Sequence, residues 1–268
     1  MKKVRLDRLV HELGLTPSRE RARTTIMSGL VFADGKRADK PGSPVSPDSK
    51  IEIRGDKLPY VSRGGLKLEK ALKVFQIEVA GKCCIDCGAS TGGFTDVLLQ
   101  NGALKVYAVD VGYGQLAWSL RNDPRVVNME RTNIRYVTPD LLPEKPGLAV
   151  VDLSFISVGL ILKPLFSLLK DNGEAVCLIK PQFEAGKEKV GKKGVVRDKT
   201  IHAEVIEGVF DFAEREGFSA AGLDFSPVKG PEGNTEFLVH LIKGAQQKKR
   251  PDAGSVTQAA AGFFERKA

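Results

Sequence analysis

The chain has 268 residues with ordinary contents of apolar residues, glycine and proline, enough for one large globular domain and a small one. The formal net charge is +8, and residues 1–63 hold most of it, with 14 lysines and arginines against 8 acidic residues. The later residues have 27 against 25. No apolar run approaches the roughly 20 residues that cross a bilayer, and the charged start lacks the apolar core of a secretory leader. We therefore expect a soluble, cytoplasmic protein whose basic first quarter either binds a polyanion or is a solvated face.

Residues 5–54 have the pattern of a compact α+β unit. One face of a short first helix is predicted from the apolar residues Leu6, Leu9, Val10, Leu13 and Leu15. Ser18 is a good N-cap for a second helix that should run to about Ser28 and end at Gly29. An Asp-Gly turn at 34–35 then favours a hairpin, and residues 51–53 alternate like a strand.

From residue 64 onward, helix and strand patterns alternate. Helices are expected at about 66–75, 91–101, 158–170 and 200–216. Strands are expected at 83–86, 105–110, 126–129, 148–152, 175–179, 220–225 and 236–242. This order predicts a doubly wound α/β sheet with two antiparallel strands at its end. The basic tail from residue 245 is expected to be partly disordered, with Phe263 and Phe264 able to dock.

Three of the four cysteines lie at residues 83–87, in one apolar stretch, and the fourth is Cys177. Cys84 and Cys87 have the spacing of a redox or zinc pair, but no further ligands follow at a suitable spacing. We expect no metal site, and we expect small buried residues on a strand that remain free thiols.

The strongest local motif is the glycine-rich segment 85–95, where a strand enters a turn and a helix follows. Its spacing is Asp86-x-Gly88-x-x-x-Gly92, and the dinucleotide fingerprint Gly-x-Gly-x-x-Gly is absent. Glycines let the backbone approach a ligand closely, and a helix N-terminus favours negative groups. Asp110 ends the next strand, where a carboxylate can accept hydrogen bonds from both hydroxyls of a ribose.

Four charged residues are expected near the same edge of this sheet. Asp152, Lys180 and Glu236 lie at strand ends or starts, and Lys67 lies on the helix before the first strand. A lysine near a second cation and an apolar wall can be shifted toward its neutral form, which is able to activate a hydroxyl.

The Asp-x-Gly-x-x-x-Gly turn resembles the S-adenosylmethionine-binding turn of Rossmann-like methyltransferases. That resemblance implies S-adenosyl-L-methionine as the cofactor, with the methionine end near Gly88 and Ala89, the ribose at Asp110 and the adenine near Thr132 or Asn133. The full expected cofactor set is Asp86, Gly88, Ala89, Ser90, Thr91, Gly92, Gly93, Phe94, Asp110, Thr132 and Asn133.

The set Lys67, Asp152, Lys180 and Glu236 resembles the Lys-Asp-Lys-Glu tetrad of the FtsJ-like RNA ribose 2'-O-methyltransferases. Nearly the whole chain, including the segment 60–68 (Tyr-Val-Ser-Arg-Gly-Gly-Leu-Lys-Leu), resembles the TlyA-type proteins, which are described both as hemolysins and as ribosomal-RNA methyltransferases. The resemblance implies methylation of a cytidine 2'-hydroxyl in ribosomal RNA. Lys180 would activate the hydroxyl, Asp152 would orient Lys180, and the other two would steer the hydroxyl and balance charge.

The first fifty residues resemble the small RNA-binding domain of ribosomal small-subunit protein four. The expected RNA-contacting residues are Arg5, Arg19, Arg21, Arg23, Lys36, Arg37 and Arg63. The expected divisions are an RNA-binding domain at 1–54, a linker at 55–63, a methyltransferase domain at 64–244 and a basic tail at 245–268. The expected partners are ribosomal RNA or ribosomal subunits.

Three alternatives stay open at this point. The chain could be a non-catalytic RNA-binding or ribosome-assembly protein, although it keeps all four tetrad residue types. It could be a membrane-lysing protein, although no lytic helix is evident. It could be a small-molecule methyltransferase or a dehydrogenase, which the basic N-terminal unit and the lysine pair disfavour.

Overall fold

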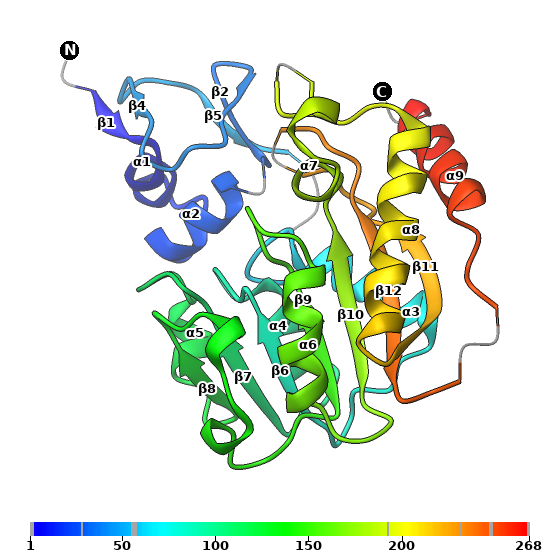
Figure 1. The fold of residues 1–268 in the computed structure, drawn as a ribbon. Coiled ribbons are helices and arrows are strands. Elements are labelled where there is room, and N and C mark those ends of the chain that lie inside the picture. The colour runs from blue at the N-terminus through cyan, green and yellow to red at the C-terminus, as the bar shows by residue number, and fades with distance from the viewer. Residues whose placement is uncertain are drawn as a thin grey trace.

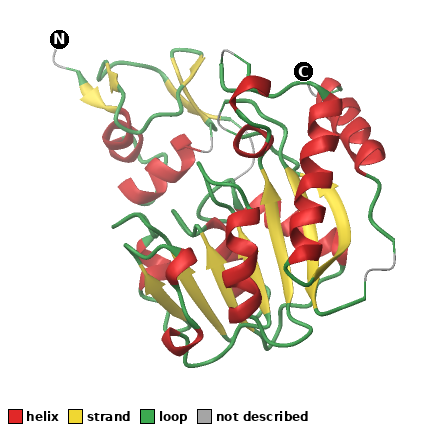
Figure 2. Cartoon of the chain, in the orientation of Figure 1, coloured by secondary structure: helices red, strands yellow, loops and turns green. Residues whose placement is uncertain are grey.

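The computed structural model describes residues 3–27, 29–54, 58–191, 193–230, 232–246 and 249–266. Figure 1 shows a small N-terminal unit beside the carboxyl-end edge of a large α/β domain, and Figure 2 shows helices on both faces of its sheet. Ser28 and residues 55–57 of the expected linker lie outside the described residues.

The N-terminal unit has two helices packed on short strands. They are β1 (Val4–Arg5), α1 (Leu6–Glu12), α2 (Arg19–Met27), β2 (Val31–Ala33), β3 (Lys36–Arg37), β4 (Pro44–Val45) and β5 (Ile51–Ile53). Strand β2 pairs with β3 and β5, and β1 pairs with β4, all antiparallel. The core consists of Leu6, Val10, Ala22, Ile26 and Val31. The predicted unit is therefore present.

Local sequence signals set the bounds of these helices. The backbone N–H of Arg21 donates to Ser18 Oγ at 3.1 Å, which is the expected cap of α2. Gly29 has a φ of 71°, so the chain leaves α2 through the left-handed region that glycine tolerates. The first helix is shorter than its apolar pattern suggested, because it ends at Glu12 and leaves Leu13 and Leu15 exposed.

The large domain is built on a seven-stranded sheet. Its strands are β6 (Cys83–Cys87), β7 (Lys105–Val109), β8 (Val126–Met129), β9 (Leu148–Val151), β10 (Glu174–Ile179), β11 (Phe218–Phe225) and β12 (Phe237–Lys243). Their order across the sheet is β11-β12-β10-β9-β6-β7-β8. All neighbours are parallel except β12, which is antiparallel to both β10 and β11, so the predicted antiparallel finish is confirmed.

Helices cover both faces of this sheet. The longer ones are α3 (Gly65–Phe75), α4 (Gly93–Gln100), α6 (Gly159–Leu168), α8 (Lys199–Arg215) and α9 (Ala253–Glu265). Short helices are α5 (Trp118–Arg121), α7 (Pro181–Glu184) and three 3₁₀ turns at Ile134–Tyr136, Pro139–Leu141 and Lys187–Lys189. Helices α3 and α4 contribute to one apolar core, whereas α6, α8 and α9 contribute to the other. The fold is therefore the expected doubly wound α/β arrangement.

In the basic tail, residues 253–265 form helix α9, whereas residues 247–248 and 267–268 lie outside the described residues. The Phe263 ring packs 5.2 Å from that of Phe225 on β11, which realises the expected docking. Arg250 forms ion pairs with Glu207, Asp211 and Glu214 of α8. Tertiary contacts of this kind, which no local pattern encodes, hold the tail against the domain.

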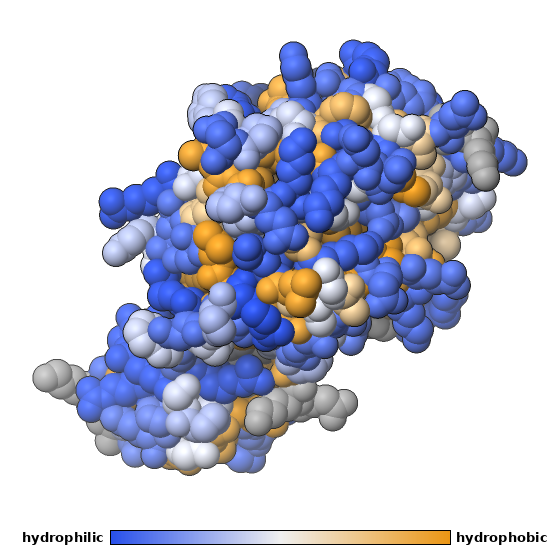
Figure 3. Space-filling model, turned by 90° about the horizontal axis from the view of Figure 1, so that it is seen from below, coloured by the Kyte–Doolittle hydropathy of each residue, from blue (hydrophilic) through white to orange (hydrophobic). Residues whose placement is uncertain are grey.

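The cysteines lie in the interior of the protein, and the surface is mainly hydrophilic. All four cysteines are buried free thiols, as expected, with Cys84 and Cys87 on β6. Among the described residues, no group of side chains has the make-up of a metal site, and no helix is long and apolar enough to cross a membrane. The face in Figure 3 is mainly hydrophilic, with hydrophobic residues in separate patches.

Among the described residues, hydrogen bonds join α2 to the linker segment and to the large domain. Arg21 Nη2 donates to the carbonyl oxygen of Leu58 at 2.9 Å. The backbone N–H of Trp118 donates to Glu20 Oε1 at 2.8 Å, so α2 contacts the start of α5. These contacts place α2 beside the carboxyl ends of the parallel strands (Figure 1), where ligand sites of α/β sheets lie.

Candidate active site

The glycine-rich turn between β6 and α4 is tightly packed against the end of β9. Gly88 has a φ of 90°, and a Cβ atom on it would lie 2.6 Å from the backbone oxygen of Asp152. A Cβ on Gly92 would meet Leu120 and Leu116, and one on Gly93 would meet Ser62 Oγ. The positive φ of Gly88 and Gly92 and the backbone contact at Gly88 favour glycine at both positions, and the turn therefore leaves its backbone open toward the sheet edge.

Asp86, at the end of β6, holds the turn through hydrogen bonds to Thr95 of α4. Its carboxylate is fully buried, and Oδ2 accepts hydrogen bonds from the backbone N–H of Thr95 at 2.9 Å and from Thr95 Oγ1 at 2.7 Å. Oδ1 has no partner in the described part of the chain. Burial, reinforced by the nearby charges of Asp152 and Asp110, raises the pKa of Asp86 to about 7 against the hydrogen bonds from Thr95.

Asp110, at the end of β7, is oriented by two backbone amides. Oδ2 accepts from the N–H of Ser90 at 2.8 Å, and Oδ1 accepts from the N–H of Gly112 at 2.6 Å. A carboxylate has about four lone-pair positions, so Asp110 retains acceptor capacity toward a ligand.

A cavity of about 470 Å³ opens in front of this turn. Of the expected cofactor residues, it is lined by Gly88, Ser90, Asp110, Thr132 and Asn133. Its other walls include Gln115, Ile134, Leu153, Ser154, Phe155 and Ile156, which the sequence interpretation did not single out. A volume of this size suits a drug-sized or nucleoside-sized ligand.

A second cavity of about 230 Å³ adjoins the first. Of the expected cofactor residues, it is lined by Gly88, Ala89, Ser90, Thr91, Gly93 and Phe94. Its other walls include all four tetrad residues, Lys67, Asp152, Lys180 and Glu236. Asp86 and Gly92 line neither of these two cavities, so their place is beneath the turn and not at its surface.

The four charged residues form one connected chain of contacts. Lys180 Nζ lies 2.6 Å from Asp152 Oδ1, and Lys67 Nζ lies 3.2 Å from Asp152 Oδ2. Lys67 Nζ also lies 2.8 Å from Glu236 Oε2. Asp152 therefore bridges two lysines, and Lys67 bridges two carboxylates. The sequence prediction that these residues share one sheet edge is matched by their positions.

The pKa values of the tetrad residues depend on their burial and on the opposite charges beside them. Burial lowers the pKa of Lys67, but Asp152 and Glu236 outweigh that effect and leave it raised. For Asp152, burial raises the pKa, but Lys67 and Lys180 outweigh it and leave the pKa lowered. Charged forms of both residues are thus favoured by their partners, because each removed charge would strand its neighbour in a buried site.

The loop after β9 adds two residues that the sequence interpretation did not assign. Lys180 Nζ donates to Ser154 Oγ at 3.0 Å. Phe155 has a φ of 65°, its side chain is 89 % exposed, and its ring lies 5.1 Å from that of Phe183. An exposed phenylalanine held in a strained backbone conformation beside a cavity is a signal of ligand contact that only the structure supplies.

A third cavity, of about 220 Å³, lies between the two domains. Thr24 and Met27 of α2 form one wall, and Arg63, Lys67 and Lys229 contribute to the other. It shares Lys67 with the tetrad cavity, so the N-terminal unit lies directly beside the tetrad.

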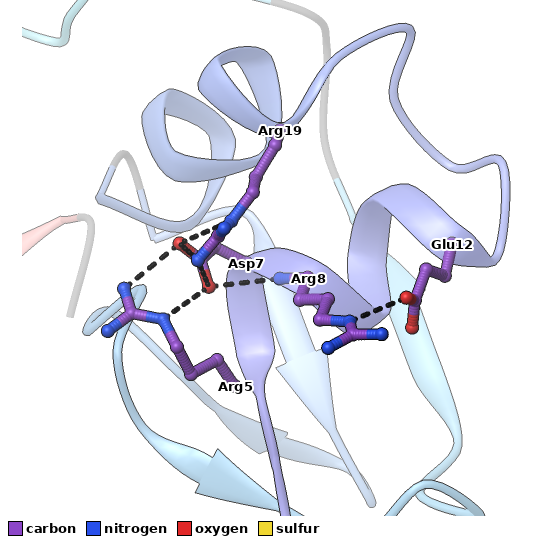
Figure 4. Close-up of polar contacts among 5 residues, drawn as sticks. All are labelled: Arg5, Asp7, Arg8, Glu12 and Arg19. Atoms are coloured by element: carbon purple, nitrogen blue, oxygen red, sulfur yellow. Dashed lines mark hydrogen bonds and ion pairs between the residues drawn. The ribbon is translucent and has the colours of Figure 1, made fainter.

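The arginines expected to contact RNA lie in different surroundings. Arg5 and Arg19 both pair with the buried carboxylate of Asp7, which Figure 4 shows together with the neighbouring pair of Arg8 and Glu12. Asp7 holds both guanidinium groups at the surface of α1 and α2.

The remaining expected RNA contacts are less constrained. Arg21 is half-buried and used in the domain contact, whereas Arg23, Lys36 and Arg37 are exposed. Arg63 is half-buried and has no ion-pair partner among the described residues.

Comparison with known proteins agrees with this arrangement. Residues 60–243 match the model of the FtsJ-like methyltransferase family, and residues 4–51 match that of the S4 domain. A Bacillus subtilis protein provisionally named as an rRNA methyltransferase, YqxC, is 55 % identical over 241 residues, which cover 90 % of this chain and 86 % of that protein. The Mycobacterium tuberculosis protein named 16S/23S rRNA (cytidine-2'-O)-methyltransferase TlyA is 46 % identical over 241 residues, covering 90 % of each.

A solved structure from Streptococcus thermophilus that carries a provisional hemolysin name is also similar. It is 50 % identical and has a TM-score of 0.81, with 100 % of this chain and 98 % of that chain covered. The family match spans all seven strands of the large sheet, including the glycine-rich turn and the tetrad. The chain therefore belongs to the FtsJ-like methyltransferase family, with an S4 domain in front of the methyltransferase domain.

Proposed function

We propose that this protein transfers a methyl group from S-adenosyl-L-methionine to the 2'-hydroxyl of a cytidine ribose in ribosomal RNA. The observation that carries the proposal is the position of the tetrad where two cavities meet. The larger cavity and the tetrad cavity share Gly88, Ser90, Asp152 and Ser154. A donor in one and an acceptor in the other would face each other across these residues. The relative named for this reaction, at 46 % identity, supports the same acceptor.

The larger cavity fits the proposed cofactor. Gly88 leaves the backbone open, Asp110 offers a carboxylate to a ribose, and Ile134 and Leu153 offer apolar walls to an adenine. Asp110, which has no ion-pair partner among the described residues, gives the cavity a negative charge that suits a cationic ligand. When bound, S-adenosylmethionine supplies an electrophilic methyl group on a positively charged sulfur. Asp86 and Gly92 would hold the turn in shape without touching the ligand.

Lys180 is the proposed base for the acceptor hydroxyl. Its amine lies in the tetrad cavity, 2.6 Å from Asp152 Oδ1. Asp152 orients this amine and also holds Lys67, which Glu236 holds from its other side. Lys67 is thereby kept as an ammonium ion that can donate to the acceptor oxygen and stabilise the negative charge developing there. Positioning of the two reactants would contribute much of the rate.

The S4 domain is the proposed RNA-binding element. Arg5, Arg19, Arg23 and Lys36 would contact phosphates on its surface, as the charge of residues 1–63 favours. The cavity between the domains leads from α2 to Lys67, and Arg63 lies in its wall. A nucleotide entering there would reach the tetrad with its phosphates near Arg63. Phe155, exposed at the edge of the larger cavity, would offer a stacking surface to the base.

The test is transfer of labelled methyl from S-adenosylmethionine to purified ribosomal subunits by the wild-type protein and by Lys180→Ala. Ribose-linked label with the wild type, and only a small residual rate with the variant, is the expected result. Absence of transfer to subunits and to free ribosomal RNA, with cofactor binding intact, would refute the proposed substrate. Equal transfer by both proteins would refute the role of Lys180.

A further inference from the structure

Ser154 makes a contact that the tetrad alone does not explain. Its hydroxyl oxygen accepts a hydrogen bond from Lys180 Nζ at 3.0 Å, and Asp152 Oδ1 lies 2.6 Å from the same nitrogen. Ser154 follows β9 in the loop that also carries Asp152, and it lines both the larger cavity and the tetrad cavity. The lysine amine is thus held between two acceptors at the boundary of the two cavities.

The two acceptors restrict the direction in which the Lys180 amine can point its lone pair. In the neutral form that the proposed role as base requires, the Lys180 amine has two N–H bonds and one lone pair, arranged tetrahedrally with Cε around nitrogen. With one acceptor, the amine can rotate about Cε–Nζ and turn its lone pair in several directions. With two acceptors, both N–H bonds are committed, and the lone pair has a single remaining direction.

We propose that Ser154 is a positioning residue that, together with Asp152, fixes the lone pair of Lys180 toward the acceptor hydroxyl. This inference rests on the proposed function and adds a residue to it. The acceptor O–H proton passes to the lone pair of Lys180, which becomes an ammonium ion. The acceptor oxygen forms a bond to the methyl carbon as the methyl–sulfur bond breaks, and that electron pair stays on sulfur. Lys180 afterwards releases the proton to water.

The surroundings of Ser154 allow an effect on the Lys180 amine to be distinguished from an effect on folding. The residue is exposed, so truncation to alanine leaves no internal cavity. Ser157, on the same loop, provides a matched control, because its hydroxyl accepts from the backbone N–H of Gly159 at 3.2 Å and it lines neither of these two cavities. Loss of that bond disturbs the loop without touching Lys180.

The experiment compares Ser154→Ala, Ser154→Thr and Ser157→Ala on ribosomal subunits, under saturating and limiting RNA. We expect Ser154→Ala to lower kcat about 10- to 100-fold, with the KM for RNA and the calorimetric Kd for S-adenosylmethionine within about twofold of wild type. Ser154→Thr keeps the hydroxyl and should restore most of kcat, and Ser157→Ala should behave like wild type.

A double-mutant cycle then tests whether Ser154 acts through Lys180. On a Lys180→Ala background, Ser154→Ala should lower the residual rate no further. A wild-type kcat in Ser154→Ala overturns the inference, as does a loss confined to KM or to cofactor affinity, or an equal loss in the alanine and threonine variants. A wild-type protein inactive on every RNA would instead defeat the proposed function, so the two failures are distinguishable.

Discussion

The Cα atom of Gly88 lies directly against the backbone oxygen of Asp152, so that a Cβ at this position would be 2.6 Å from that oxygen. The backbone that follows β6 therefore packs against the backbone that follows β9 with no room for a side chain at Gly88. Because Asp152 bridges the two lysines, the shape of the glycine turn and the position of the tetrad depend on each other.

We predict that Gly88→Ala abolishes cofactor binding and destabilises the fold. The substitution combines a φ of 90° with a clash against backbone, and should cost about 2–4 kcal/mol. Gly114→Ala is the matched control, since its φ of 68° imposes strain but a Cβ there meets nothing within 4 Å. Titration calorimetry with S-adenosylmethionine and thermal unfolding would measure both effects. Cofactor affinity preserved in Gly88→Ala would contradict the close approach.

Asp152→Asn should lower the methylation rate about 10²- to 10⁴-fold. The substitution removes the carboxylate that both lysines contact, so Lys180 loses the acceptor that orients its amine and Lys67 loses one of its two counter-charges. Single-turnover kinetics with labelled cofactor would measure the loss. Asp224→Asn breaks a comparable ion pair with Lys70 away from the cavities and should leave the rate unchanged. A similar rate loss in both variants would argue for general destabilisation instead.

Asp86 should make the protein less stable as the pH rises toward neutrality. Its pKa is raised from 3.8 to about 7 in the folded state, so between these values the folded protein holds a proton that the unfolded chain has released. The stability associated with this proton is full below pH 4 and is lost as the pH rises through 7.

Urea unfolding at pH 5 and pH 8 would measure this loss. Between these pH values the free energy of unfolding should fall by about 2–3 kcal/mol more in the wild type than in Asp86→Asn. The asparagine oxygen can still accept from Thr95, so the variant should fold. An identical pH response in the two proteins would show that Asp86 is ionised in the folded state throughout this range.

Arg37 and Arg63 should bind RNA as a pair that spans the two domains. Burial and the nearby charge of Arg37 lower the pKa of Arg63, against the opposing charges of Asp39 and Glu236. The Arg37 guanidinium also packs against Gly29, at the end of α2. A phosphate bound between these two arginines would remove their mutual repulsion, which should strengthen RNA binding.

Alanine at either of these arginines should weaken binding to ribosomal RNA and reduce the salt slope by about one, and the double variant should lose less than the sum. Fluorescence anisotropy over a salt series would test this, with Lys163→Ala on the exposed side of α6 as the control for charge alone. Strict additivity would mean that the two residues contact separate phosphates.

Much of the large domain could be predicted because its signals are local. Buried strands end in polar residues, and parallel strands place those ends on one edge, so Asp110, Asp152 and Lys180 could be brought together before any coordinates existed. Helix caps behaved in the same way, with Ser18 and Gly29 marking the bounds of α2. The resemblance to a family then gave these residues their expected roles.

What could not be predicted depends on contacts between distant segments. Helix α9 has mostly small residues and is held by Phe225 and by acidic side chains of α8, none of which a local pattern reveals. Ser154 matters because a lysine 26 residues later reaches it. Asp86 has the position of a ligand-binding acid in the motif, yet its side chain turns inward to Thr95.

Thr24 and Met27 belong to α2 of the S4 domain, yet they line the cavity that contains Lys67. The S4 domain and the cavity beside the tetrad therefore do not form independent parts of the structure. An S4 domain exchanged for that of a ribosomal protein would change the wall of this cavity, so the hybrid could bind RNA and still present the wrong nucleotide to Lys67.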